Sequence, residues 1–214
     1  MNRKKQAYEY LKNEIITNRF RPETPIIEME IASKLKMSRS PIREAMRELE
    51  MEGLIVSHPG QGSFVASISP YDVEEIYELR ILLESWALKR SISRITSEEL
   101  DNLEHDFKTA FRESDWEALH QADRALHNLI INKSLSKRLI AFMNILNSQI
   151  ERIRYISAKN KKRAELSYHE HLKIIHYLRE HNLDKCKMTL KAHLKSVVQS
   201  AMEVAKISKI ETKS

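Results

Sequence analysis

The chain has 214 residues, of which 42% are hydrophobic and 31% charged, with three glycines, one cysteine and a formal net charge of +6. This composition favours a helix-rich globular protein over an all-β one, and the single cysteine excludes an internal disulfide framework. No apolar run reaches the roughly 18–20 residues that a membrane-spanning helix needs, and the N-terminus lacks the apolar core of a signal peptide. We therefore expect a cytoplasmic protein without membrane contact, whose positive charge is compatible with nucleic-acid binding but does not establish it.

Two predicted helices begin the chain. Residues 4–20 carry an apolar stripe at helical spacing and end before Pro22, which predicts a structural helix. Residues 26–35 predict a shorter helix. Its side chains expected to face inward are Ile27, Ile31, Ala32 and Leu35. A tight turn at Lys36 and Met37 would join this helix to the next one.

The segment from Ser38 to Gly53 predicts one short helix with a defined start and stop. Ser38 or Ser40 can accept a hydrogen bond from an amide of the first turn, Pro41 suits that turn, and Gly53 suits a left-handed closing position. The side chains expected in the core are Ile42, Ala45, Met46 and Leu49. The arginines, at Arg39, Arg43 and Arg47, stand four apart and form one exposed stripe. Taken alone, such a stripe also fits a simple solvated face.

Two short strands are predicted next, at residues 54–56 and 63–66, around a turn-rich tip of sequence His58-Pro59-Gly60-Gln61-Gly62. A helix, a tight turn, a second helix and a hairpin are the elements of a winged helix-turn-helix. In that arrangement the second helix enters the major groove by its N-terminal end, where arginines pair with guanine edges or phosphates. The sequence therefore predicts a DNA-binding domain over residues 1–67.

The run SRSPIREAM, followed by Leu49-Glu50 and Glu52-Gly53-Leu54, resembles the DNA-binding signature of the GntR family of bacterial transcription regulators. The run GQGSFV is similar to the glycine-rich wing of that family. The resemblance implies that Arg39 and Arg43 contact operator bases, that Ser38 and Ser40 bind phosphate, and that the wing tip reaches the minor groove. The full predicted DNA-binding set is Ser38, Arg39, Ser40, Arg43, Arg47, His58, Gly60, Gln61 and Gly62.

Three positions depart from the pattern of the GntR family. Glu23 and Lys36 stand where glycines are usual, which suggests a different turn at Glu23. Met29 replaces an arginine that contacts DNA in some relatives, so we expect no DNA contact of that kind from this position.

A polar, proline-containing linker at residues 67–70 predicts a domain boundary, and everything after it reads as helical. Helices are expected at residues 71–93, 97–113, 114–132, 135–157, 164–180 and 184–206, with a charged break at 159–163 and a hinge at 181–183. Core side chains are expected at Val73, Ile76, Leu79, Leu83, Trp86 and Ala87, and at Leu139, Phe142, Met143, Leu146, Ile150 and Ile153. The predicted fold class is mostly α, with an N-terminal winged helix-turn-helix followed by an antiparallel all-helical bundle of about six helices over residues 71–208.

Four residues in this bundle share a suggestive spacing. Asp123 and His127 are four residues apart on one helix face, and His171 and His193 each lie eleven residues from Asn182 in the hinge. Equal distances from a hairpin turn place two residues at the same height, so both pairs can converge inside a bundle. One carboxylate and three imidazoles suit zinc, nickel or manganese and can leave a coordination position open for a small carboxylate. The same spacing also fits ordinary buried or helix-capping histidines.

The order Asp123-x-x-x-His127, Glu170-His171 and Ala192-His193-Leu194 resembles the effector-binding FCD domain of the FadR-type branch of the GntR family. In many members, residues at these positions bind a metal that helps to hold an organic acid, which implies the metal ligands Asp123, His127, His171 and His193. Arg80 and Glu84 match a further pattern of that branch. Arg80 fits equally a contact to an effector carboxylate or a structural salt bridge. The predicted effector-binding residues are Arg80, Glu84, Asn144, Asn147 and Arg154.

Together these features predict a metabolite-responsive bacterial transcription regulator that binds a palindromic double-stranded DNA operator as a homodimer. We expect a repressor that senses a small organic acid through a divalent metal ion, although the sequence does not fix the sign of regulation. Two alternatives remain open: a regulator for which the metal ion itself is the signal, and a metal-dependent enzyme that carries a DNA-binding module. The enzyme is disfavoured because only Glu170 stands beside the ligands as a general base, so we expect no catalysis.

Overall fold

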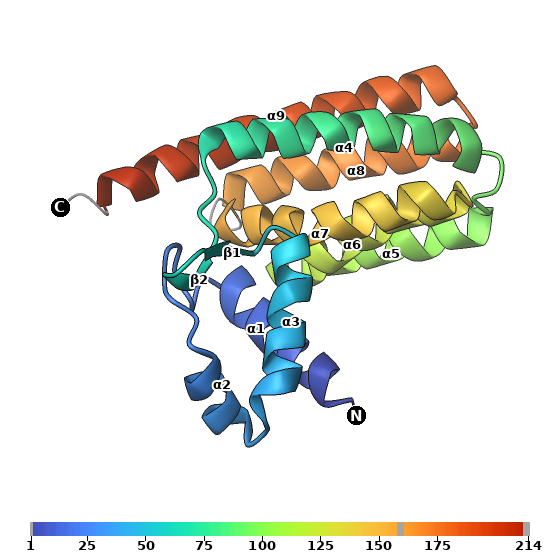
Figure 1. Ribbon diagram of the computed structural model, residues 1–214. Coiled ribbons are helices and arrows are strands. Elements are labelled where there is room, and N and C mark those ends of the chain that lie inside the picture. Colours follow the sequence, from blue (N-terminus) through green and yellow to red (C-terminus); the bar gives the residue numbers. More distant parts are fainter. Residues whose placement is uncertain (1, 158–160, 212–214) are drawn as a thin grey trace. The chain divides into compact units, whose positions relative to one another are not determined.

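The computed structural model of the chain describes residues 2–157 and 161–211 and is mostly helical (Figure 1). The chain divides into two compact units. Unit 1 holds Met1–Asp72 and Asn144–Ile156, and unit 2 holds Val73–Met143 and Ser157–Ser214. Within the described ranges, no helix combines the length and the apolar character that crossing a membrane requires.

Unit 1 contains the predicted winged helix-turn-helix. Its elements are α1 (Arg3–Ile16), α2 (Glu28–Leu35), α3 (Arg39–Met51), β1 (Ile55–His58) and β2 (Gly62–Val65). The two strands pair antiparallel, with Ile55 opposite Val65 and His58 opposite Gly62. The core forms between α1, α3 and the root of the wing. It includes Ala7, Leu11, Ile15, Ile42, Ala45, Leu49, Leu54 and Val65, all fully buried.

The first two helices are shorter than predicted. Helix α1 ends at Ile16 instead of residue 20, and Asn18 beyond it takes a left-handed φ of 55°. The prediction that Ile27 faces inward is wrong, because 45% of this side chain is exposed, whereas Ile26 is 5% exposed. The physical reason is that α2 begins only at Glu28. Ile27 is still in extended backbone, and the amide of Ile26 before it donates to the Ser63 carbonyl of β2 at 2.8 Å.

The turns before and after α2 keep the backbone of the motif without its glycines, so the different turn suggested at Glu23 is wrong. Lys36 and Glu23 adopt left-handed φ values of 52° and 65°, so both keep the backbone conformation that glycine favours, at a cost of roughly 1–2 kcal/mol each. Gly53 closes α3 at a φ of 71°, as predicted. The predicted serine cap does not form: Ser38 precedes α3 without a side-chain cap bond, and Ser40 Oγ donates to Glu44 Oε1 at 3.4 Å.

The helices after the wing are α4 (Pro70–Ser91), α5 (Ser97–Arg112), α6 (Trp116–Lys133), α7 (Lys137–Ser157), α8 (Lys161–Arg179) and α9 (Leu183–Glu211). This confirms the helical bundle. Thr96 and Glu99 form a capping box at α5, and the Asp115 side chain caps α6. Helices α8 and α9 pack side by side, and α5 packs against both α6 and α8 (Figure 1). Residues 144–156 of α7 group with unit 1.

The core face of α4 is only partly the one predicted: Val73, Ile76 and Ala87 are buried, and Leu83 is half-buried. Leu79 and Trp86 are 42% and 47% exposed, whereas Arg80 and Glu84 are 2% and 0% exposed. The buried face of α4 therefore holds a polar pair among its apolar residues: Arg80 bonds to Glu84, and Glu84 bonds to His127 of α6. Phe142, also predicted in the core, is 60% exposed.

Several helix ends also differ from the predicted ones. Helix α8 begins at Lys161 rather than at residue 164, and α9 continues to Glu211, past the predicted end at 206. Of the predicted charged break, residues 159 and 160 lie outside the described residues.

Candidate metal centre and candidate nucleic-acid interface

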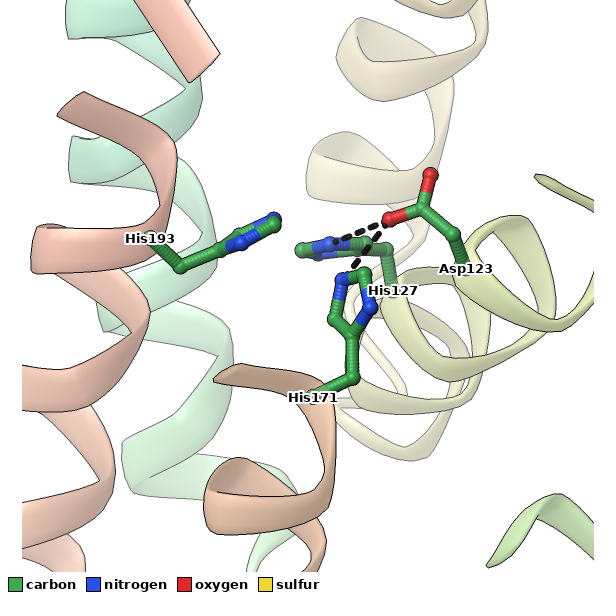
Figure 2. Close-up of side chains that lie close together, drawn as sticks. All are labelled: Asp123, His127, His171 and His193. Atoms are coloured by element: carbon green, nitrogen blue, oxygen red, sulfur yellow. Dashed lines mark ion pairs between the residues drawn. The ribbon is translucent and has the colours of Figure 1, made fainter. Parts of the chain in front are cut away.

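The four residues singled out by spacing lie together inside unit 2. Asp123 and His127 come from one face of α6, His171 from α8 and His193 from α9, and Figure 2 shows their side chains pointing toward one another. One candidate ligand atom from each residue lies within 4.8 Å of the others. The Asp123 Oδ1 atom is 3.2 Å from His127 Nε2 and 2.9 Å from His171 Nε2. The rings of His171 and His193 have centroids 4.4 Å apart.

Two carboxylates hold the outer edges of two of these rings. His127 Nδ1 lies 2.5 Å from Glu84 Oε2 of α4, and Glu84 Oε1 accepts a hydrogen bond from Arg80 Nε at 2.5 Å. His193 Nδ1 lies 2.8 Å from Glu170 Oε2 of α8, and Glu170 also pairs with Arg163. A histidine that is bonded through Nδ1 is held in orientation and presents Nε2 to a metal. Both rings therefore have the outer partner that is typical of metal-binding histidines.

The charges of the cluster suit a cation. Burial of Glu84 opposes its ionisation, but the Arg80 guanidinium and His127 outweigh burial and lower the pKa of this carboxyl to about 2. Burial, followed by the neighbouring His171 and His127, holds the pKa of His193 well below its usual value. His193 is therefore a neutral imidazole at pH 7, which is the form that binds metal.

The donor set also fits a bound ion on geometric grounds. The His127 Nε2 atom is buried and lies 3.2 Å from Asp123 Oδ1, but no contact within the described ranges has the geometry of a hydrogen bond to this nitrogen. A polar atom buried in this way costs free energy unless a partner satisfies it. A divalent cation between this nitrogen and the Asp123 carboxylate would supply that partner.

The predicted effector-binding residues are divided between the two units. Arg80 makes the structural salt bridge that was one of its two interpretations, and Glu84 is fully buried against His127. Asn144, Asn147 and Arg154 belong to the part of α7 that groups with unit 1, whereas the four candidate ligands belong to unit 2. Their contact with an effector stays a prediction.

Sequence reasoning missed the partners that surround the cluster. Glu170 stands next to His171 in the chain, but its bond to His193 depends on the pairing of α8 with α9. Phe107 of α5 stacks on His171, with ring centroids 4.9 Å apart, and no spacing in the sequence indicates this contact.

The predicted DNA-binding residues form the second candidate site. All nine are exposed. Arg39 is the first residue of α3, so it stands at the end of the helix where the backbone amides point outward. At the wing, Gln61 N donates to the His58 carbonyl at 3.0 Å, and the left-handed φ values of Gly60 and Gly62, 76° and 102°, favour glycine. A feature that the sequence did not reveal is that Arg39 and Arg43 both bind the carboxylate of Glu28.

The segment with the candidate DNA-binding residues and the segment with the four clustered residues each match a known protein family. Residues 3–65 match the family described as "Bacterial regulatory proteins, gntR family", and residues 75–196 match the FCD domain. The first range holds α1 to β2, and the second holds all four residues of the cluster.

Similar proteins have related descriptions. An uncharacterized HTH-type transcriptional regulator of Bacillus subtilis, YdhC, is 31% identical over 192 residues, which cover 88% of this chain and 86% of that protein. The HTH-type transcriptional repressor RspR of Escherichia coli is 26% identical, over 93% of this chain and 89% of the repressor. The solved structure of the Zn²⁺-bound FCD domain of TM0439 has a TM-score of 0.58 and 24% identity, and covers 64% of this chain and 96% of its own. The chain is therefore a DNA-binding transcription regulator rather than an enzyme, and it belongs to the GntR family in the group that carries an FCD domain.

Proposed function

We propose that the chain is a cytoplasmic, metabolite-responsive repressor that binds a palindromic operator as a homodimer and senses a small carboxylate through a metal-containing FCD domain. The observation that carries the sensing part is the buried cluster of one carboxylate and three imidazoles, with a carboxylate behind two of the rings. In this proposal residues 1–67 read DNA, and residues 71–208 bind the effector and dimerise.

The proposed ligands of the metal are Asp123, His127, His171 and His193. Three imidazoles and one carboxylate suit zinc, nickel or manganese, and an ion with five or six coordination positions would keep one or two for a ligand. A carboxylate fits such a position because it brings negative charge to the cation. The relative whose FCD domain is described as Zn²⁺-bound supports zinc as the first ion to test.

The proposed DNA contacts are Arg39 and Arg43 to bases, and Ser38 and Ser40 to phosphates. Arg47 is proposed to contact DNA as well, and the wing residues His58, Gly60, Gln61 and Gly62 to reach the minor groove. Two copies are needed because one short helix reads only a few base pairs, and a two-fold dimer places two such helices about one DNA turn apart. Exposed apolar residues on α4 support dimerisation: Leu79, Leu82 and Trp86 are 42%, 68% and 47% exposed. An uncovered apolar stripe of this kind is typical of an interface.

Repression follows if the dimer occupies its operator in the absence of the effector. Binding of the carboxylate then favours a second arrangement of the two DNA-binding domains. The affinity for the operator falls by an amount set by how much more tightly the carboxylate binds the second arrangement than the first. The similarity to a protein described as a repressor supports this sign.

A second candidate is a regulator for which the metal ion is the signal. The burial of all four donors favours it, because each is at most 9% exposed and a bound ion would be enclosed. In that case operator affinity changes when the ion is added, and organic acids have no further effect.

One experiment separates these functions. The purified protein is stripped with a chelator and its metal content is measured, and it is then titrated with a duplex that it selects from a random DNA library. The titration is repeated with Zn²⁺ alone and with Zn²⁺ plus a panel of small mono-, di- and tricarboxylic acids. The proposal predicts about one ion per chain and loss of operator affinity only when an acid is present. A protein that binds no metal at neutral pH would contradict the sensing mechanism.

A further inference from the structure

The Glu28 carboxylate, in the first turn of α2, binds both of the proposed reading arginines of α3. Arg43 donates from Nε to Oε1 and from Nη2 to Oε2, both at 2.9 Å. Arg39 donates from Nε and from Nη2 to Oε2, at 3.2 Å and 3.0 Å. One carboxylate therefore accepts four hydrogen bonds and ties two arginines together across the turn of the helix-turn-helix.

Each arginine uses the same edge of its guanidinium for this contact. The Nε–Nη2 edge faces Glu28, and among the described residues no partner binds Nη1 of either arginine. A guanidinium reads guanine with a pair of parallel N–H groups, directed at O6 and N7. The edge formed by Nη1 and the second hydrogen of Nη2 therefore stays available for a base while Glu28 holds the other edge.

Exposure fits this division of roles. The side chains of Arg39 and Arg43 are 59% and 51% exposed, whereas that of Glu28 is 23% exposed. A nucleic acid can thus reach the arginines while Glu28 stays behind them. An arginine side chain carries about 2 kcal/mol of rotamer entropy. Two arginines whose orientation is already restricted lose less of that entropy on binding.

The negative charge of Glu28 weakens binding to DNA of any sequence. The hydrogen bond from Arg43 is the main cause that lowers the pKa of this carboxyl to about 2, against a smaller effect of burial, and Arg39 adds to it. Glu28 is therefore anionic at neutral pH and sits between two cations. Binding to arbitrary DNA depends on attraction of cations to phosphates, and an anion at this point weakens that attraction.

We propose that Glu28 is a positioning residue that determines specificity. It orients Arg39 and Arg43 toward base edges and lowers their affinity for the backbone of arbitrary DNA. This inference rests on the proposed reading of the operator by these arginines. The bland interpretation is that Glu28 only places negative charge at the N-terminus of α2, where such charge stabilises a helix.

The test compares the affinity for two duplexes: one selected by the wild-type protein from a random library, and a scrambled duplex of the same composition. Glu28→Gln removes the charge and replaces one of the two acceptor oxygens with an NH2 group, which cannot accept from an arginine. Glu28→Asp keeps the charge but shortens the side chain by one methylene. Glu30→Gln is the matched control, because Glu30 lies in the same first turn of α2, is exposed and makes no side-chain bond among the described residues.

The expected result for Glu28→Gln is a roughly tenfold fall in the ratio of selected to scrambled affinity, with affinity for the scrambled duplex rising. The slope of log affinity against log salt on scrambled DNA should steepen by about 1, as expected when one more phosphate is neutralised. Glu28→Asp should keep the wild-type salt slope and still lose several-fold in the ratio. Glu30→Gln should leave the ratio within about twofold of wild type.

Two outcomes would overturn the inference. One is an unchanged ratio in Glu28→Gln, and the other is an equal loss in Glu30→Gln, which would reduce Glu28 to a helix-terminal charge. Melting temperatures identify any variant that fails to fold, and Glu28→Asp, which retains the carboxylate, decides the matter if Glu28→Gln does not fold.

A failure of the proposed DNA reading can be distinguished from a failure of the role proposed for Glu28. If the wild-type protein selects no sequence, the proposed reading of DNA fails. If it selects a sequence and Arg43→Ala abolishes the preference while the Glu28 variants keep it, only the role of Glu28 fails.

Discussion

In each unit a carboxylate orients the side chains of a proposed binding site, but the partners of one carboxylate are exposed and those of the other are buried. In unit 1, the Glu28 carboxylate orients arginines that are more than half exposed. In unit 2, the Glu84 carboxylate orients His127 and binds Arg80, and none of the three side chains is more than 3% exposed. Both carboxylates have a pKa of about 2, because cationic partners outweigh the effect of burial.

Similar contacts of a carboxylate with a cation need not contribute similar free energies to folding. An ion pair at the surface is screened by water and contributes roughly 0–1 kcal/mol. A buried charge that loses its partner costs roughly 3–5 kcal/mol. We therefore expect Glu28 to matter for recognition and little for folding, and Glu84 to matter for both the metal centre and the stability of its unit.

The largest expected effect is on metal binding by unit 2. His171→Ala removes a ligand from the proposed coordination shell, so we expect metal affinity to fall by more than the roughly 10–100-fold that loss of an outer partner causes. Metal per chain, measured by elemental analysis after dialysis, should drop from about one to near zero. The control is His169→Ala, because His169 lies two residues away on α8 and is exposed. Full metal content in His171→Ala would remove this residue from the site.

The next largest effect compares the two carboxylates directly. Glu84→Gln leaves the buried Arg80 guanidinium without its anionic partner, so we expect the free energy of unfolding to fall by about 3 kcal/mol. Glu28→Gln should lower it by less than about 1 kcal/mol. Urea denaturation of the metal-free protein measures both. Equal losses for the two variants would contradict the assignment of one carboxylate to the interior and the other to the surface.

The sequence predicted the fold well because periodicity and turn signals report local structure. The winged helix-turn-helix and the helical bundle are confirmed, and α5 begins at residue 97, where the sequence places it. The four clustered residues could also be grouped, since Asp123 and His127 share a helix face, and His171 and His193 are equidistant from a hinge.

Contacts between distant elements could not be predicted in this way. Periodicity placed Leu79 and Trp86 in the core of α4, but the inner face carries Arg80 and Glu84, because Glu84 meets His127 of another helix. Glu28 was overlooked for the same reason. An acidic residue in a first helical turn is common, and only the fold shows that it lies beside two arginines fifteen and eleven residues later in the chain.

An intermediate effect is expected at the DNA surface. Arg43→Ala should weaken binding to a selected duplex by about 1–3 kcal/mol if Arg43 pairs with a base, while binding to scrambled DNA changes much less. Fluorescence anisotropy with both duplexes measures this difference. Lys5→Ala, which removes one exposed positive charge from α1, serves as the control for charge alone. Equal losses on both duplexes would make Arg43 a phosphate contact.

The smallest effect concerns the titration of Glu28 itself. Its pKa is lowered in the folded protein, so its contribution to stability is complete above the unfolded pKa of about 4.5 and is lost as the pH falls toward 2. Because both arginine partners are more than half exposed and water screens the ion pair, that contribution stays under about 1 kcal/mol. Carbon NMR of the carboxyl in the isotopically labelled protein should give a midpoint near 2, which moves back toward 4.5 in Arg43→Ala, since Arg43 is the main cause of the shift. A midpoint of 4.5 in the wild-type protein would mean that the arginines leave Glu28 in solution, and the resemblance between the two carboxylates would then be limited to the buried one.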